Sequence, residues 1–271
     1  MWWPVLSFAL VVLRTEAARV LDLTHPYDNN TMTWPTIRQF EMKQSENTKG
    51  TYYLQEELHM GTHSGTHMDA PCHFARGRWC VADIPLERLF DVPAVVIDVQ
   101  RGQDGELTPE DLDKWESEYG PIPKHAVIIL RSGWALKYSN RREYFGSDIP
   151  NSTEGLRFPG FSPEAAKWIV GRTDISGLGI DTPSIDPGTS KTFPSHVILA
   201  QSNLYNLEHL ADLSELPANG ARLTILPMKI AGGSGAPVRV VAYLPSASFA
   251  VGPSFILLLF SLLVLGLNPR G

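Results

Sequence analysis

The chain has 271 residues, of which 43% are hydrophobic and 19% charged, with 22 glycines, 21 prolines and no internal repeat. This composition excludes collagen-like, coiled-coil and intrinsically disordered proteins. The 23 Lys and Arg residues against 29 Asp and Glu residues give a net charge of −6, and no basic run is long enough to follow a phosphate backbone. We therefore expect no nucleic-acid partner. A chain of this length buries a sizeable core without disulfides, so one compact domain of enzyme size is expected.

Residues 1–18 are predicted to be a secretory signal peptide. From Trp2 to Leu13 the chain is almost wholly apolar, and the small residues Ala17 and Ala18 then offer a cleavage site. No Lys or Arg precedes the apolar run, as one does in most signal peptides. A buried N-terminal strand is therefore the alternative.

Residues 246–271 are predicted to be a hydrophobic anchor signal. The segment Phe255–Leu267 has thirteen uncharged residues, whereas a spanning helix needs ~20. Small residues and a short spacer, Phe249–Ser254, precede it, as in signals for a glycosylphosphatidylinositol anchor. A short membrane span is the alternative. With glycosylation sequons at Asn29 and Asn151, these ends predict passage through the secretory pathway and a location outside the cell or on its surface.

Residues 19–245 are predicted to form one α/β domain whose topology stays open. Thr108-Pro109 and Ser162-Pro163 each place a hydroxyl N-cap before a proline and acidic residues, which predicts two helix starts. Five short apolar runs bounded by Gly, Pro or Asp are predicted to be buried strands. These runs are Ala94–Val99, Ala126–Leu130, Ile175–Ile180, Arg222–Leu226 and Val238–Tyr243.

Four of the eight histidines in the chain, and one aspartate, lie between His59 and His73. Imidazole and carboxylate groups suit Zn²⁺, Mn²⁺ or Fe²⁺, and metal–ligand bonds of ~2.0–2.2 Å require the ligand atoms to converge. In a straight strand, His63 and His67 would stand about 13 Å apart. A helix would turn Asp69 away from His63, and Gly65 is a poor helix former. The segment must therefore bend, and Gly65 and Pro71 are placed to bend it.

The pattern His63-x3-His67-x-Asp69-x3-His73 resembles the signature of the cyclase-like metal hydrolases, which include bacterial-type kynurenine formamidases and isatin hydrolases. The resemblance covers nearly all of residues 20–244. Its further segments are Trp34-Pro35, Gly179–Pro187, Ser190–His196, Leu226–Ile230 and Gly235–Val238. The resemblance implies a single compact α/β domain of the swivelling β/β/α type.

The resemblance also implies a metal site. His63, His67 and Asp69 match the ligands of a first ion, with Asp69 placed to bridge, and His196 and Glu208 match the ligands of a second ion. The isatin hydrolases work with one ion, commonly manganese. We therefore expect Zn²⁺ or Mn²⁺ as the cofactor, with one or two ions per chain.

Three further residues are expected at the substrate. By resemblance, His73 is the proton donor or acceptor, and Trp34 is an aromatic wall of the pocket. Phe74 is expected to form a second wall for a flat aromatic substrate. His59 lies outside the pattern, either supporting a ligand or simply exposed.

The expected reaction is hydrolysis of a C–N bond other than a peptide bond. A divalent ion lowers the pKa of its bound water toward ~7, and His73 then carries a proton to the departing aniline nitrogen. By resemblance, the first substrate is N-formyl-L-kynurenine, giving L-kynurenine and formate in tryptophan catabolism, and the second is an isatin-like lactam. A homodimer is expected, because family members are commonly dimers.

A catalytically inactive, surface-tethered binding protein on the same scaffold is the competing hypothesis. The complete ligand set and His73 argue against it, because a decayed scaffold would be expected to lose at least one of these residues. A serine hydrolase is not supported, since Ser132 lacks the G-x-S-x-G pattern of a nucleophile elbow.

Three local features complete the sequence predictions. Cys72 and Cys80 either pair in an oxidising compartment or stay as thiols, and a disulfide there would affect the adjacent His73. Asp181 and Asp186 are placed to cap turns at least as readily as to take part in catalysis. The glycine-rich segment 232–235 is predicted to be a turn, because it lacks the Lys-Ser/Thr of a phosphate-binding loop.

Overall fold

The computed structural model describes residues 19–171 and 174–244, and Val20–Leu244 form one compact unit. The predicted signal peptide and anchor signal, residues 1–18 and 246–271, lie outside the described residues. Within the described part of the chain, no helix is both long and apolar enough to span a bilayer.

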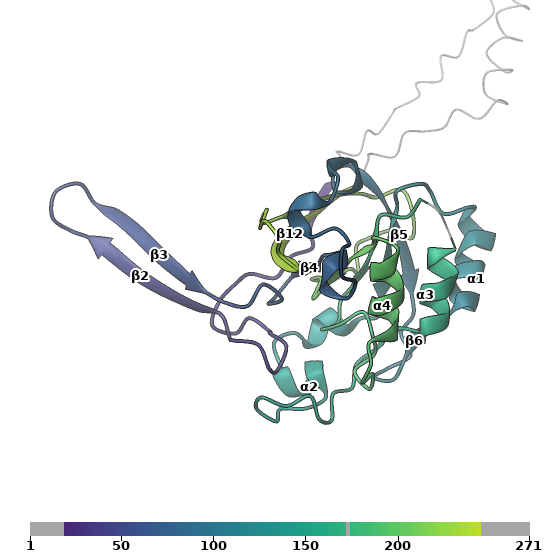
Figure 1. The fold of residues 1–271 in the computed structure, drawn as a ribbon, viewed down its shortest axis with the longest axis horizontal. Coiled ribbons are helices and arrows are strands. Elements are labelled where there is room, and N and C mark those ends of the chain that lie inside the picture. The colour runs from purple at the N-terminus through teal and green to yellow at the C-terminus, as the bar shows by residue number, and fades with distance from the viewer. Residues whose placement is uncertain (1–18, 172–173, 245–271) are drawn as a thin grey trace, which may run out of the picture. The chain divides into compact units, whose positions relative to one another are not determined.

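A closed β-sheet forms the centre of this unit (Figure 1). Its strands are β4 (His67–Asp69), β5 (Val92–Asp98), β7 (Val127–Arg131), β9 (Gly177–Ile180), β10 (Tyr205–Glu208), β11 (Arg222–Pro227) and β12 (Gly235–Leu244). The strand order is β12-β11-β5-β7-β9-β10-β4, and β4 pairs again with β12, which closes the sheet. The short strand β1 (Arg19–Asp22) pairs with β12 on its other side.

All five predicted strands are present, with ends that shift by up to three residues. Strand β5 shows why a continuous apolar run predicts such a strand. Both of its faces are covered, so both need apolar side chains. Ala94 and Val96 belong to the core cluster inside the sheet, whereas Val95 and Ile97 pack among residues of the covering helices. β5, β7, β9 and β10 run parallel to one another, which completes the predicted α/β class.

The two predicted helices begin where their caps indicated. α1 (Pro109–Tyr119) starts with a capping box between Thr108 and Asp111, and α3 (Pro163–Val170) starts with the Ser162 side chain accepting from the Ala165 N–H. The remaining helices and helical turns are α2 (Arg141–Phe145), α4 (Pro194–Gln201), η1 (Pro71–His73), η2 (Val81–Asp83), η3 (Leu86–Arg88) and η4 (Trp134–Lys137). Figure 1 shows α1, α3 and α4 side by side over one part of the sheet.

Among the described residues, two small sheets lie outside the closed sheet. β6 (Glu106–Leu107) pairs with β8 (Gly160–Phe161). β2 (Glu41–Asn47) pairs with β3 (Tyr53–His59) in a hairpin that extends away from the closed sheet (Figure 1). The sequence analysis did not predict this hairpin, because its strands are polar and exposed and lack the apolar runs of a buried strand.

Candidate metal centre

Strand β4 brings three of the predicted ligands together. His67 and Asp69 lie on one face of the strand, and Met68 between them points into the core, where it is fully buried. β4 pairs with β10 in a register that sets Glu208 opposite His67. The pairing with a distant strand therefore supplies a second carboxylate to the face that carries His67 and Asp69.

The segment before β4 bends as predicted. Gly65 has a φ of +57°, which a side chain would strain, and a Cβ there would lie 3.0 Å from both Tyr27 and Thr31. The bend lets His63 turn back toward the strand. Its Nδ1 lies 2.6 Å from Asp69 Oδ1.

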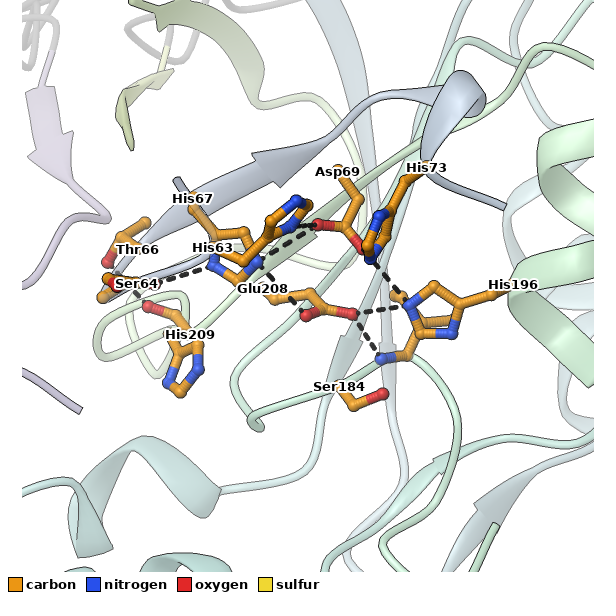
Figure 2. A network of polar contacts seen from close by, with 12 residues as sticks. His63, Ser64, Thr66, His67, Asp69, His73, Ser184, His196, Glu208 and His209 are labelled. Carbon is orange, nitrogen blue, oxygen red and sulfur yellow. Dashed lines mark hydrogen bonds and ion pairs between the residues drawn. The ribbon is translucent and has the colours of Figure 1, made fainter. Parts of the chain in front are cut away.

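His63, His67 and Asp69 form the first group of potential ligands (Figure 2). His67 Nδ1 donates to the Gly65 carbonyl at 2.9 Å, which leaves the Nε2 lone pair directed toward Asp69 Oδ1 at 3.2 Å. His63 Nε2 lies 3.0 Å from the Ser234 hydroxyl, which leaves its Nδ1 for the cluster. Hydrogen bonds of this kind fix which ring nitrogen a histidine offers to a metal.

Asp69, His196 and Glu208 form the second group. His196 Nε2 lies 3.3 Å from Asp69 Oδ2 and 3.0 Å from Glu208 Oε1. Figure 2 shows these side chains converging from different parts of the chain. Asp69 directs one oxygen to each group, which is the arrangement that a bridging ligand would need.

The donor set fits a divalent transition metal. Within each group the potential ligand atoms lie within 4.8 Å of one another, and they are imidazole nitrogens and carboxylate oxygens, which suit Zn²⁺ and Mn²⁺. Burial would raise the pKa of the Asp69 carboxyl, but hydrogen bonds with His196 and His63 outweigh burial and hold the pKa well below its usual value. Asp69 therefore stays ionised, as a metal ligand must be.

His73 lies beside these groups without belonging to either. Its ring stacks on the His63 ring with centroids 4.1 Å apart, and its Nε2 is 3.9 Å from Asp69 Oδ2. Burial lowers the pKa of His73 to about 4, although the Asp69 charge acts in the opposite direction. The ring is thus neutral near pH 7 and retains a lone pair that can accept a proton.

Cys72 and Cys80 form a disulfide next to His73, which answers the question that the sequence left open. The bridge spans a sequence separation of 8, and the Cys72 N–H donates to the Trp79 carbonyl within the same loop. The loop carries both His73 and Phe74. The disulfide therefore restrains the segment that presents the expected proton carrier.

Replacing both Cys72 and Cys80 with serine is expected to lower stability while leaving the metal ligands in place. The loss of a short cross-linked loop costs about 2–3 kcal/mol, which corresponds to a fall in Tm of roughly 5–10 °C. Thermal melting and metal analysis of the double variant check this expectation. An unchanged Tm would mean that the loop is held without the disulfide.

The ligand groups open into a cavity of about 210 Å³. Trp34, Phe74 and Phe193 supply aromatic walls, with Phe193 lying 6.0 Å from Trp34 and 5.6 Å from Phe74 between ring centroids. The other lining residues are Thr36, Ile37, His63, His67, Asp69, His73, Pro183, Ser184, His196, Glu208 and His209. All eight predicted site residues thus line one cavity, whereas His59, at the end of β3, does not.

Sequence reasoning missed several residues of this site. Phe193 and Ser184 line the cavity, Ser234 contacts His63, and Asp186 contacts His196 Nδ1 at 2.7 Å. For Asp186 the sequence left turn capping and catalysis both open, and its carboxylate also accepts hydrogen bonds from two backbone N–H groups at the start of α4. Pro194 before His196 is a helix-start signal that could have revealed α4.

Asp181, by contrast, has the capping role alone. Its carboxylate accepts from the backbone N–H groups of Ser132 and Trp134 at 3.1 and 2.8 Å, and it does not line the cavity. Residues 232–234 lie in the turn between β11 and β12, as predicted, and Gly235 begins β12. Gly235 also admits the neighbouring ring, because a Cβ there would overlap His63.

Comparison with known proteins places this site in a family. A family model described as putative cyclase matches residues 21–187, which is more than half of the chain. The isatin hydrolase of Roseibium aggregatum is 30% identical over 210 residues, covering 73% of this chain and 78% of that protein. The kynurenine formamidase of Salinibacter ruber is 29% identical over 224 residues, covering 82% of this chain and 96% of that protein.

Solved structures agree with the sequence relatives. Isatin hydrolase A from Labrenzia aggregata, bound to benzyl benzoate, has a TM-score of 0.76 at 33% identity and covers 84% of this chain and 94% of its own. Hydrolases of the cyclase family are metal-dependent, which agrees with the two ligand groups around Asp69. The predicted fold and family are therefore confirmed, and this chain belongs to the putative cyclase family of hydrolases.

Proposed function

We propose that this chain is a metal-dependent amidohydrolase that cleaves a C–N bond, other than a peptide bond, in a small aromatic amide or lactam. The observation that carries the proposal is the position of the two ligand groups sharing Asp69, at the wall of a cavity lined by Trp34, Phe74 and Phe193. A flat ring held between aromatic walls would bring its amide carbonyl to the ligand groups.

Zn²⁺ or Mn²⁺ is the proposed cofactor, held by one or both ligand groups. Such an ion would supply a water of lowered pKa and would polarise the amide carbonyl. His67 and His63 are already oriented for an ion. One ring nitrogen of each is hydrogen-bonded, to the Gly65 carbonyl and the Ser234 hydroxyl respectively, which leaves the other nitrogen for the ion.

His73 is the proposed proton carrier. The oxygen of the attacking water joins the carbonyl carbon, and His73 accepts the proton that this water releases. As the C–N bond breaks, His73 delivers the proton to the departing nitrogen. Its position beside Asp69, but outside both ligand groups, leaves the ring free for this transfer.

Two substrates follow from the sequence, N-formyl-L-kynurenine and an isatin-like lactam. The cavity favours the lactam, because none of the described residues that line it is a lysine or an arginine. N-formyl-L-kynurenine carries an amino-acid carboxylate, which would enter this cavity without a cationic partner.

Steady-state kinetics on three compounds test the proposal. Isatin, N-formyl-L-kynurenine and 2-formamidoacetophenone are compared on Mn²⁺- and Zn²⁺-loaded protein, since the last compound keeps the aryl formamide and lacks the amino-acid group. We expect the two uncharged compounds to have the higher kcat/KM. A preference for N-formyl-L-kynurenine would restore it as the first substrate. Turnover of none of the three would favour the inactive binding protein.

We also propose that the protein is a homodimer in which the β2–β3 hairpin contacts the second copy. Met42 and Leu58 face each other across the hairpin and are 50% and 54% exposed. A two-stranded hairpin is marginally stable in water without a packed face. Light scattering should therefore give a dimer for the wild type and a monomer for the Met42→Glu, Leu58→Lys variant, with metal content retained. A dimeric variant would exclude this surface.

We propose, finally, that the protein acts outside the cell or at its surface. A disulfide is typical of an oxidising compartment, and the sequon residues Asn29 and Asn151 are exposed. Phosphatidylinositol-specific phospholipase is expected to release active protein from intact cells if the anchor is a lipid, whereas a membrane span would retain it. Mass spectrometry that finds Met1 and the 255–267 tail in a cytosolic fraction would contradict the proposed location.

A further inference from the structure

Asp186 lies behind the second ligand group and outside the cavity lining. It is only 1% exposed. Its Oδ2 accepts from His196 Nδ1 at 2.7 Å and from the His196 backbone N–H at 3.0 Å, and its Oδ1 accepts from the Ser195 N–H at 3.1 Å. We infer that Asp186 is a positioning residue that fixes the ring nitrogen His196 presents to a metal ion. This inference rests on the proposed metal-dependent function.

The hydrogen bond decides the tautomer of His196. An ionised carboxylate can only accept, so the proton of a neutral His196 ring must sit on Nδ1. The lone pair is then on Nε2, which lies 3.3 Å from Asp69 Oδ2 and 3.0 Å from Glu208 Oε1. A lone pair and two carboxylate oxygens directed at one point repel one another unless a proton or a metal cation lies between them. The pair of Asp186 and His196 therefore prepares a position for a cation.

The residue next to Asp186 prepares the other ligand of the same group. The Ile185 backbone N–H donates to Glu208 Oε1 at 2.8 Å. Ile185 and Asp186 thus orient Glu208 and His196 respectively, although these two ligands lie on β10 and α4. The segment 185–186 acts as a common support for the second ligand group.

Backbone contacts hold this segment in place on two sides. The carboxylate of Asp186 is fixed by the N–H groups at the start of α4, which carry partial positive charge. On the other side, Gly160 in β8 packs so closely that a Cβ there would lie 2.7 Å from the Asp186 carbonyl carbon. The carboxylate cannot move away from His196 without disturbing one of these contacts.

Helix capping alone is the competing explanation, and metal affinity distinguishes the two. A cap stabilises the fold whether or not a metal is present, whereas loss of a positioning partner lowers metal affinity by roughly 10–100-fold. Asp186→Asn keeps the size of the side chain and offers one acceptor oxygen in place of two. It cannot serve both Ser195 N–H and His196 Nδ1 as the carboxylate does.

The test is a Mn²⁺ titration of metal-free protein, with free Mn²⁺ measured by electron paramagnetic resonance. His196→Ala first identifies the ion that depends on His196. Asp186→Asn is expected to weaken the binding of that ion by about 10–100-fold and to leave the affinity for any other ion unchanged. Ser190→Ala is the matched control, because its hydroxyl lies 3.5 Å from Asp186 Oδ1 and does not contact His196. It should bind Mn²⁺ as the wild type does.

Circular dichroism melting of the metal-free variants separates misfolding from lost affinity. If Asp186→Asn does not fold, Asp186→Glu is used in the same titration. It displaces the carboxylate by one methylene and is expected to weaken the binding of the same ion. A folded variant with wild-type affinity for that ion would overturn the inference. The inference would also be overturned if the His196→Ala variant bound as many Mn²⁺ ions as the wild type. The titration contains no substrate, so a failure to find a hydrolysed amide would overturn only the proposed function.

Discussion

Replacing Asp69 with alanine is expected to remove bound metal and hydrolysis together. Asp69 is shared by the two ligand groups, with Oδ1 2.6 Å from His63 Nδ1 and Oδ2 3.3 Å from His196 Nε2. No other carboxylate belongs to both groups among the described residues. Its loss leaves buried imidazoles around a site that water fills poorly, so both ligand groups lose a member at once.

We expect kcat/KM of Asp69→Ala to fall by more than about 100-fold, the upper end of what losing a partner behind a ligand costs. Metal analysis and the amide assay are run on the same preparation. Asp181→Asn is the matched control, because Asp181 is also a buried carboxylate but does not line the cavity. Wild-type metal content and turnover in Asp69→Ala would show that the site has been wrongly assigned.

The strands and helix starts could be predicted from the sequence because their signals are local. The runs at β5 and β7 are apolar on both faces, as strands of a covered parallel sheet must be. The capping box of α1 joins Thr108 to Asp111, so the helix-start signal lies within four consecutive residues. In each case the physical cause of the structure lies inside the segment that shows the pattern.

The arrangement of the site is less predictable, because it depends on pairings between distant strands. His67 and Glu208 face each other only because β4 pairs with β10, and nothing in either segment specifies that partner. The resemblance to the family named both residues without giving this reason. Asp186 shows the same limit, since its sequence neighbours indicate a turn cap, whereas its bond to His196 appears only once α4 is in place.

His73→Ala is expected to separate chemistry from metal binding. His73 lies outside both ligand groups, so the variant should keep the metal content of the wild type. Its imidazole lies 3.9 Å from Asp69 Oδ2 and belongs to neither ligand group, so it can carry a proton to the departing nitrogen. Its loss should therefore lower kcat by roughly 10²–10⁴-fold, the usual contribution of a positioned acid–base group. KM should change much less, because Trp34 and Phe74 still hold the ring.

Metal analysis and steady-state kinetics of His73→Ala are compared with those of two other histidine variants. His63→Ala removes a ligand and should lose metal, whereas His59→Ala is the matched control, because His59 ends β3 and does not line the cavity. A metal loss in His73→Ala equal to that in His63→Ala would make His73 a ligand. Unchanged turnover with full metal content would remove His73 from the mechanism, and the proton would then have to reach the nitrogen from water.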